Sequence, residues 1–185
     1  MNSPNQVKSY ASVVLGWQWG LRLTNTGLPL TIPTTQQLNC GWNFNFTQTV
    51  AGATDVSYDM FMHTIPNPTS SNDPSDEIMV WLWRVGGAGP TGTKQNSTPL
   101  TLAGASWDLY RGMISNQGNG TVWNVFSYVR TTNASTTTMN MMAFFNDLST
   151  RGWLAGKYLT SVETGTEVFT GTGELDTTGF FCRIQ

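Results

Sequence analysis

The glutamates of this sequence are few, and they are the first candidates for chemistry. They are Glu77, Glu163, Glu167 and Glu174. Two of them, Glu77 and Glu167, stand in strand-like segments next to aromatic residues. Two carboxyl groups that face each other can act as nucleophile and proton donor in glycosidic-bond cleavage, and retaining hydrolases hold them roughly 5–5.5 Å apart. Because Glu77 and Glu167 are far apart in the sequence, only the fold can bring them together.

The segment Glu77–Val85 has the alternation of a β-strand. Successive strand side chains point to opposite faces, so one face carries a carboxylate, a methionine and two tryptophans: Glu77, Met79, Trp81 and Trp83. The other face is apolar and is the expected core face, with Ile78, Val80 and Leu82. The first face indicates a sugar-binding cleft, since pyranose rings lay their C–H faces on indoles; the alternative is that a second layer also buries it, with Glu77 at its rim.

Two further acidic positions lie in strand-like segments. Asp59 stands in the middle of Val56–Met62, where an aspartate is disfavoured unless it has a partner or a task. Glu167 and Phe169 share a face in the segment Gly165–Gly171, which puts a second carboxylate beside an aromatic ring. Glu77, Asp59 and Glu167 are therefore the candidates for acid–base chemistry.

The elements that would position these residues are mainly strands. Short apolar or alternating runs, separated by clusters of Gly, Pro, Asn and Ser, predict a sandwich or barrel of many strands. The clearest strand candidates are Val56–Met62, Glu77–Val85, Ser106–Tyr110, Val122–Val129, Tyr158–Glu163 and Thr178–Ile184, and residues 67–74 and 86–96 are predicted loops. One segment has helical spacing, because apolar side chains recur at Met141, Phe144, Phe145 and Leu148.

That spacing predicts a helix over Thr136–Leu148 that packs against the back of a sheet. Ser135 or Thr136 would cap its start, and Gly152 would follow its end. We interpret its Met and Phe side chains as packing residues, not as a binding site.

Composition narrows the possible partners. Only 11% of the 185 residues are charged and 12% are aromatic, with 8 tryptophans, against about 25% charged residues in an average domain. The formal net charge is −2 and the Lys and Arg residues are scattered, so we expect no nucleic-acid partner. No apolar run is long enough to span a bilayer, so we expect no membrane partner either. Low charge with many Trp is typical of an extracellular β-protein that handles sugars.

Cysteine and histidine are too rare for several common site types. Cys40 and Cys182 either form one bridge or are two buried thiols, and the sequence leaves both open. Together with the one histidine, His63, they cannot supply the four ligands of a structural zinc site. No G-x-S-x-G nucleophile elbow occurs, so we interpret His63 as an ordinary residue at the end of a strand.

Several motifs resemble glycoside hydrolase family 12, the endoglucanases and xyloglucanases of fungi and bacteria. The run Ser75–Leu82 (SDEIMVWL) resembles the family's nucleophile strand, and Gly165–Gly171 (GTEVFTG) resembles its acid/base motif. Further matches follow in the family's order: Val7–Tyr10, Val56–Phe61, Gly89–Gly92 and Asn140–Tyr158. The resemblance is good from about Tyr58 to Gly173.

The resemblance implies an all-β fold: a two-sheet antiparallel β-jelly roll, a concanavalin-like sandwich, with one helix on the convex face. It implies that Glu77 attacks the anomeric carbon and that Glu167 is the acid/base. Asp59 would hydrogen-bond Glu77 and orient it. The substrate-binding residues would be Met79, Trp81, Pro90 and Phe169. No cofactor or metal is implied, and we expect a monomer whose partner is a polysaccharide.

The amino-terminal region departs from the resemblance. The family domain starts several strands before its Val-Lys-Ser-Tyr, and Val13–Leu30, which contains Trp17-Gln18-Trp19-Gly20, does not resemble the family well. We therefore expect a single jelly-roll domain over residues 1–185 that is incomplete at its amino-terminal end, with residues 1–33 atypical. Residues 1–10 lack the features of a signal peptide, although the family is secreted and extracellular.

Three function classes follow. The first is a secreted retaining endo-hydrolase of β-1,4-glucosidic bonds in cellulose, mixed-linkage β-glucan or xyloglucan. The second is a catalytically impaired paralogue that binds glucan or acts as a decoy for an inhibitor. A cell-wall structural protein is a third class, which explains the composition but not the ordered motifs.

Overall fold

The computed structural model describes residues 6–116 and 118–185, and these residues form mainly β-strands. The strands of the larger sheet and its attachments are β1 (Ser9–Gln18), β2 (Leu21–Arg22), β3 (Leu30–Ile32), β5 (Thr54–His63), β6 (Asp76–Val85), β7 (Thr93–Lys94), β8 (Leu100–Leu102), β9 (Ala105–Ser115), β10 (Val122–Arg130) and β12 (Lys157–Val168). The smaller sheet contains β4 (Leu38–Val50), β11 (Thr136–Asn140) and β13 (Thr172–Ile184). The helix α1 spans Met142–Thr150.

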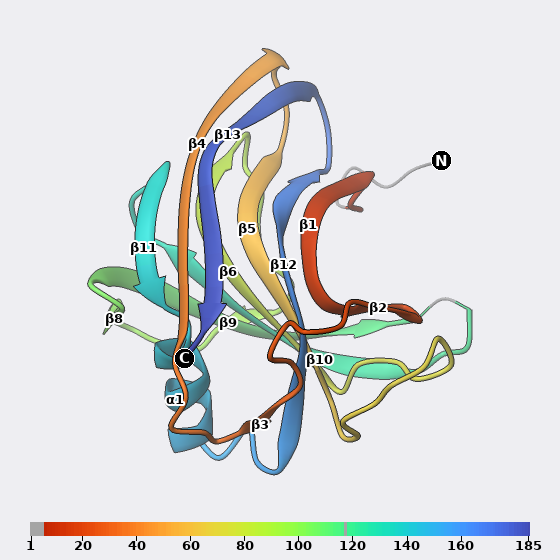
Figure 1. Ribbon diagram of the computed structural model, residues 1–185. Helices are drawn as coiled ribbons and strands as arrows, with labels where there is room; N and C mark the ends of the chain where they lie inside the picture. Colours follow the sequence, from red (N-terminus) through yellow and green to blue (C-terminus); the bar gives the residue numbers. More distant parts are fainter. Residues whose placement is uncertain (1–5, 117) are drawn as a thin grey trace.

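The two sheets form a sandwich with one open face (Figure 1). The larger sheet has the order β2-β1-β12-β5-β6-β10-β9-β7, with β3 beside β12 and β8 beside β9, and the smaller sheet has the order β11-β4-β13. Neighbouring strands are antiparallel except β6 and β10, which run parallel. The predicted jelly-roll class is confirmed, and each predicted strand lies within or largely within an observed strand.

The main core lies between the two sheets. Alternate residues of β5 and β6 enter it and are fully buried, namely Val56, Tyr58, Met60 and Met62 with Ile78, Val80 and Leu82. Since the side-chain period of a strand is two, the residues between them must face the other side of the sheet. That other side is where Glu77, Met79 and Trp81 lie, as the alternation predicted.

Trp83 departs from this prediction. The pairing of β5 with β6 shifts register between Val56 and Ser57, so that Val56 pairs with Trp83 but Ser57 pairs with Trp81. Such a bulge adds one residue to β6 and reverses the alternation beyond it. Trp83 therefore packs against the main core, and its placement beside Trp81 was wrong.

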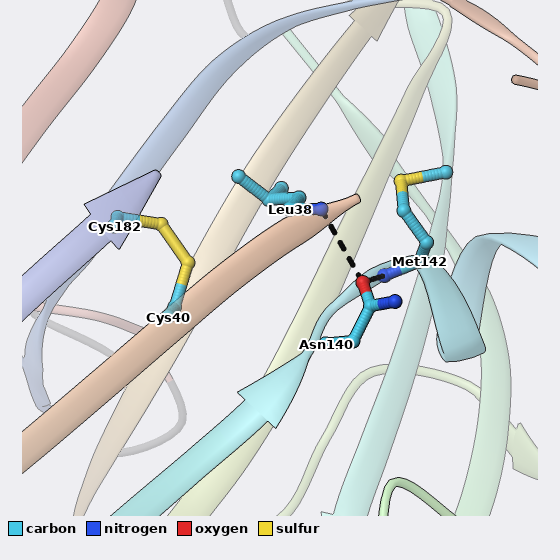
Figure 2. The surroundings of a disulfide bond; sticks show 5 residues. All are labelled: Leu38, Cys40, Asn140, Met142 and Cys182. Atoms are coloured by element: carbon cyan, nitrogen blue, oxygen red, sulfur yellow. Dashed lines mark hydrogen bonds between the residues drawn. A yellow bond between two sulfur atoms is a disulfide. The ribbon is translucent and has the colours of Figure 1, made fainter. Parts of the chain in front are cut away.

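The helix is shorter than the spacing predicted. Thr136–Asn140 forms β11, paired with β4, because β-branched threonines suit a strand better than a helix. The expected cap by Ser135 or Thr136 is therefore wrong. Figure 2 shows that Asn140 Oδ1 accepts hydrogen bonds from the backbone N–H groups of Met142 and Leu38, at 3.0 and 3.3 Å.

The helical stripe itself was correctly placed. Phe144, Phe145 and Leu148 are fully buried in the main core, and Phe144 packs edge-on against Trp107. Gly152 follows the helix with a φ of 74°, a conformation that glycine adopts readily. The helix thus extends the packed layer that covers the larger sheet, and it lies away from the open face.

The two cysteines form a disulfide. Cys40 on β4 and Cys182 on β13 lie directly opposite each other in the smaller sheet (Figure 2). The alternative of two buried thiols is therefore wrong. Among the described residues, no helix has both the length and the apolar character needed to cross a membrane.

Candidate active site

The open face of the larger sheet gathers five carboxyl groups from three neighbouring strands. They are Asp55 and Asp59 from β5, Glu77 from β6, and Glu163 and Glu167 from β12. Their even spacing along each strand puts them all on the same face. Across the β5–β12 pair, Asp55 lies opposite Glu167 and Asp59 lies opposite Glu163. The sheet therefore places Glu77 and Glu167 on the same face of three neighbouring strands, although they are far apart in the sequence.

Two of these groups line a cleft of about 1080 Å³. Glu77 and Glu167 both line it, together with Met79 and Trp81 of β6. Phe169 and Pro90 line it as well, so that each predicted substrate-binding residue lies along this cleft. Trp81 Nε1–H donates to the sulfur of Met79 at 3.4 Å, and the Trp81 side chain is 2% exposed at the floor of the cleft. A cleft with one acidic side and one aromatic side suits a substrate with both hydroxyl and C–H surfaces.

Glu77 has one strong hydrogen-bond partner. Trp123 Nε1–H donates to Glu77 Oε2 at 2.7 Å. Burial raises the pKa of Glu77 to about 7; the Trp123 hydrogen bond acts in the opposite direction, and the charges of Glu167 and Glu163 add to the rise. A carboxyl group with such a pKa changes between its ionised and protonated forms near neutral pH.

Glu167 is coupled to a neighbour that the sequence analysis missed. Burial raises the pKa of Glu167, and a hydrogen bond with Asp55 opposes the rise. Burial and the charge of Glu167 raise the pKa of Asp55 well above its usual range, while Ser57 Oγ donates to Asp55 Oδ1 at 2.8 Å. Burial therefore favours the protonated form of each carboxyl group in this pair.

Asp59 lies between the two glutamates. It is 5% exposed and pairs across β5–β6 with Met79, so Glu77 is its diagonal neighbour on the same face. Burial raises its pKa well above the usual range, and the charge of Glu77 adds to the rise. Its Oδ1 has no hydrogen-bond partner among the described residues. The expected hydrogen bond from Asp59 to Glu77 stays a prediction.

Glu163 belongs to the same face but is held by protein donors. Ser12 Oγ donates to its Oε2 at 3.1 Å, Gln18 Nε2 lies 3.4 Å from the same oxygen, and Ser161 Oγ lies 3.3 Å from Oε1. Burial raises its pKa, and the serine hydrogen bonds oppose the rise. Tyr10 lies opposite Glu167, and burial raises its pKa well above the usual range, with Asp59 the first of the nearby charges that add to it.

His63 lies at the end of β5, as predicted, and is buried. Its Nδ1 contacts Thr160 Oγ1 at 2.8 Å, and Trp17 packs on its ring edge with 4.5 Å between centroids. In the described residues, no group of three or more His, Cys, Asp or Glu side chains could hold a metal ion.

Comparison with known proteins identifies the family of this chain. The family model described as Glycosyl hydrolase family 12 matches residues 20–185. The chain belongs to this family. The family 12 match begins inside the segment that the sequence analysis expected to be atypical, so most of Val13–Leu30 is covered by it.

Three relatives show how similar this chain is to known proteins. Endoglucanase S of Pectobacterium parmentieri is 35% identical over 180 residues, which is 96% of this chain and 66% of that protein. The native family 12 xyloglucanase from Bacillus licheniformis superimposes with a TM-score of 0.91 at 33% identity, covering 98% of this chain and 77% of that one. The inactive glycoside hydrolase XLP1 of Phytophthora nicotianae is 33% identical over 172 residues, 92% of this chain and 64% of that protein. The chain thus spans about two thirds of the length of these curated relatives.

The sequence analysis missed two residues of this site, Asp55 and Trp123, for different reasons. Asp55 precedes the expected strand start at Val56 by one residue, although its spacing from Asp59 is the even spacing of a shared face. Trp123 was inside a predicted strand, but nothing local links it to Glu77. That link depends on the parallel pairing of β10 with β6, in which Asn124 lies opposite Asp76.

Proposed function

We propose that the protein is a retaining endo-hydrolase of β-1,4-glucosidic bonds in cell-wall glucans: cellulose, mixed-linkage β-glucan or xyloglucan. The observation that carries the proposal is that Glu77 and Glu167 line one cleft and interact electrostatically across it. Relatives named endoglucanase and xyloglucanase support this substrate class.

In the proposed mechanism Glu77 attacks the anomeric carbon while Glu167 protonates the leaving oxygen. A covalent glycosyl-enzyme results, and Glu167 then removes a proton from the water that hydrolyses it. The indole N–H of Trp123 favours the ionised, nucleophilic form of Glu77. Asp59, which is a diagonal neighbour of Glu77, would orient that carboxylate.

Sugar binding in this proposal uses the apolar side of the cleft. Trp81 and Phe169 would pack against the C–H faces of pyranose rings, and Met79 and Pro90 would border the same subsites. The reaction needs no cofactor, because two carboxyl groups supply both the nucleophile and the proton. We expect one catalytic domain over residues 1–185 that acts as a secreted monomer, since its polymeric substrates lie outside cells.

The test is hydrolysis by a Glu77→Gln variant. We expect the wild-type chain to release reducing sugar from xyloglucan or mixed-linkage β-glucan, with retained anomeric configuration in NMR spectra of the first products. Glu77→Gln should abolish release and spare oligosaccharide binding. Glu174→Gln is the matched control, because Glu174 is exposed on β13, outside the cleft. Hydrolysis that survives Glu77→Gln would show that the nucleophile is assigned wrongly.

A second candidate is a glucan-binding or inhibitor-binding decoy without catalysis. One relative at 33% identity is named an inactive glycoside hydrolase, which favours keeping this candidate. A folded wild-type chain that binds xyloglucan oligosaccharides but releases no sugar from any of the three glucans would support the decoy over the hydrolase.

A further inference from the structure

The turn between β1 and β2 holds a tryptophan in a backbone conformation that tryptophan disfavours. Gln18 pairs with Leu21, so Trp19 and Gly20 are the two residues of the turn. Their φ angles are 42° and 100°. Two-residue turns with positive φ at both positions strongly prefer Asn, Asp or Gly, and a bulky residue with positive φ is an outlier. Strain of this kind occurs most often at functional sites.

Trp19 is also exposed, in contrast to its aromatic neighbours. Its side chain is 43% exposed, whereas Trp17 and Trp123 are 2% and 8% exposed. Its ring centroid lies 5.3 Å from that of Trp17 and 6.4 Å from that of Trp123. Trp19 therefore has support on two sides and a free surface. Because Trp123 donates to Glu77, this row of rings begins at the proposed nucleophile.

The three rings of this row, Trp17, Trp19 and Trp123, are not among the residues that line the cleft described above. Glu77 is at the start of β6, and the cleft lining includes Trp81, farther along β6, and Phe169, which follows β12. Trp123 precedes Asn124, which pairs with Asp76, so it lies at the other side of Glu77. The β1–β2 turn, at the lower right of Figure 1, adds Trp19 beyond it.

An endo-hydrolase cleaves inside a polymer and so must hold sugar rings on both sides of the bond. Trp81 and Phe169 supply aromatic surface on one side of Glu77. We infer that Trp19 is a stacking platform for a glucose ring of the β-1,4-linked chain on the other side. This inference rests on the proposed function. It explains why an exposed indole occupies a turn position that suits asparagine, since asparagine has no comparable apolar face.

The experiment replaces Trp19 by the residue that the turn prefers. In the Glu77→Gln background, Trp19→Asn should keep or raise the melting temperature, because Asn-Gly is a favoured pair for this turn. Its affinity for cellohexaose and for xyloglucan oligosaccharides should fall about tenfold. Its affinity for cellotriose should fall less, because a short ligand can bind on the Trp81 side alone. Leu21→Ala is the control, since Leu21 is 61% exposed on the same hairpin.

The outcomes separate the possibilities. Unchanged affinity for long oligosaccharides overturns the inference, and so does a fall in melting temperature with equal loss for short and long ligands, because that pattern marks a structural role. If the Glu77→Gln protein with Trp19 intact binds neither cellohexaose nor xyloglucan oligosaccharides, the proposed function fails and the platform fails with it.

Discussion

Removing the hydrogen bond from Trp123 should change the pH dependence of catalysis. The indole N–H donates to Glu77 Oε2 at 2.7 Å in a buried site, and phenylalanine keeps an aromatic ring but has no donor. A hydrogen bond to a charged group contributes about 1.5–3 kcal/mol, and about 1.4 kcal/mol corresponds to a tenfold change in an acid dissociation constant. Trp123→Phe should therefore raise the pKa of Glu77 from about 7 to roughly 8–9.

The direction of the expected shift in the pH profile follows from the role of Glu77, which must be ionised to attack. A higher pKa leaves less carboxylate at low pH, so the acid limb of the kcat/KM profile should move upward together with the pKa of Glu77. At a pH below both limbs, the loss of carboxylate should lower kcat/KM by roughly tenfold to a hundredfold. The assay is kcat/KM on a soluble glucan across the acid, neutral and alkaline range for wild type and Trp123→Phe.

Trp81→Phe is the matched control for this experiment. Trp81 is also buried on the same face, but its indole N–H donates to the sulfur of Met79 and not to a carboxylate. Its replacement should raise KM and leave the acid limb in place. If the limb of Trp123→Phe coincides with that of wild type, the indole does not control the ionisation of Glu77 and the reasoning is refuted.

Three further predictions concern Asp55, Glu77 and the disulfide. Asp55→Ala removes the carboxyl group whose hydrogen bond with Glu167 lowers the pKa of Glu167. The pKa of Glu167 and the alkaline limb of kcat/KM should therefore rise, which pH profiles of the variant would reveal. Folding raises the pKa of Glu77 to about 7, so the folded state binds more protons and loses stability as pH rises from about 4.5 through 7. Glu77→Gln should then be roughly 3 kcal/mol more stable than wild type at about pH 8 and equal to it at about pH 4, measured by thermal unfolding. Replacing Cys40 and Cys182 by alanine should lower the free energy of unfolding in urea by about 2–4 kcal/mol, because the bridge closes a long loop.

Each of these has a contrary outcome. An alkaline limb that stays in place or moves down in Asp55→Ala would show that Asp55 does not lower the pKa of Glu167. A stability difference for Glu77→Gln that is the same in acid and in mild alkali would show that Glu77 does not titrate differently on folding. An unchanged urea midpoint for the cysteine variant would show that the bridge does not limit the unfolded chain.

Local patterns were enough to predict much of the site. The placement of Glu77, Met79 and Trp81 on one face follows from the two-residue period of a strand. This prediction was correct because the residues between them are apolar and enter the main core. The same rule failed at Trp83, because a bulge set by the pairing with β5 reversed the alternation. The helical stripe at Phe144 was found by spacing alone, but the start of the helix depended on the pairing of β11 with β4.

The sequence by itself determined which residues could do chemistry: the scarcity of glutamates, their aromatic neighbours and the faces on which they lie are properties of short segments. Only the tertiary structure decided which of these groups meet. Asp55 reaches Glu167 through the register of β5 with β12, and Trp123 reaches Glu77 through the parallel pairing of β10 with β6. Strand register depends on the whole buried face and on distant turns. The pKa values of the carboxyl groups follow from their burial and from the neighbours that the strand register places beside them.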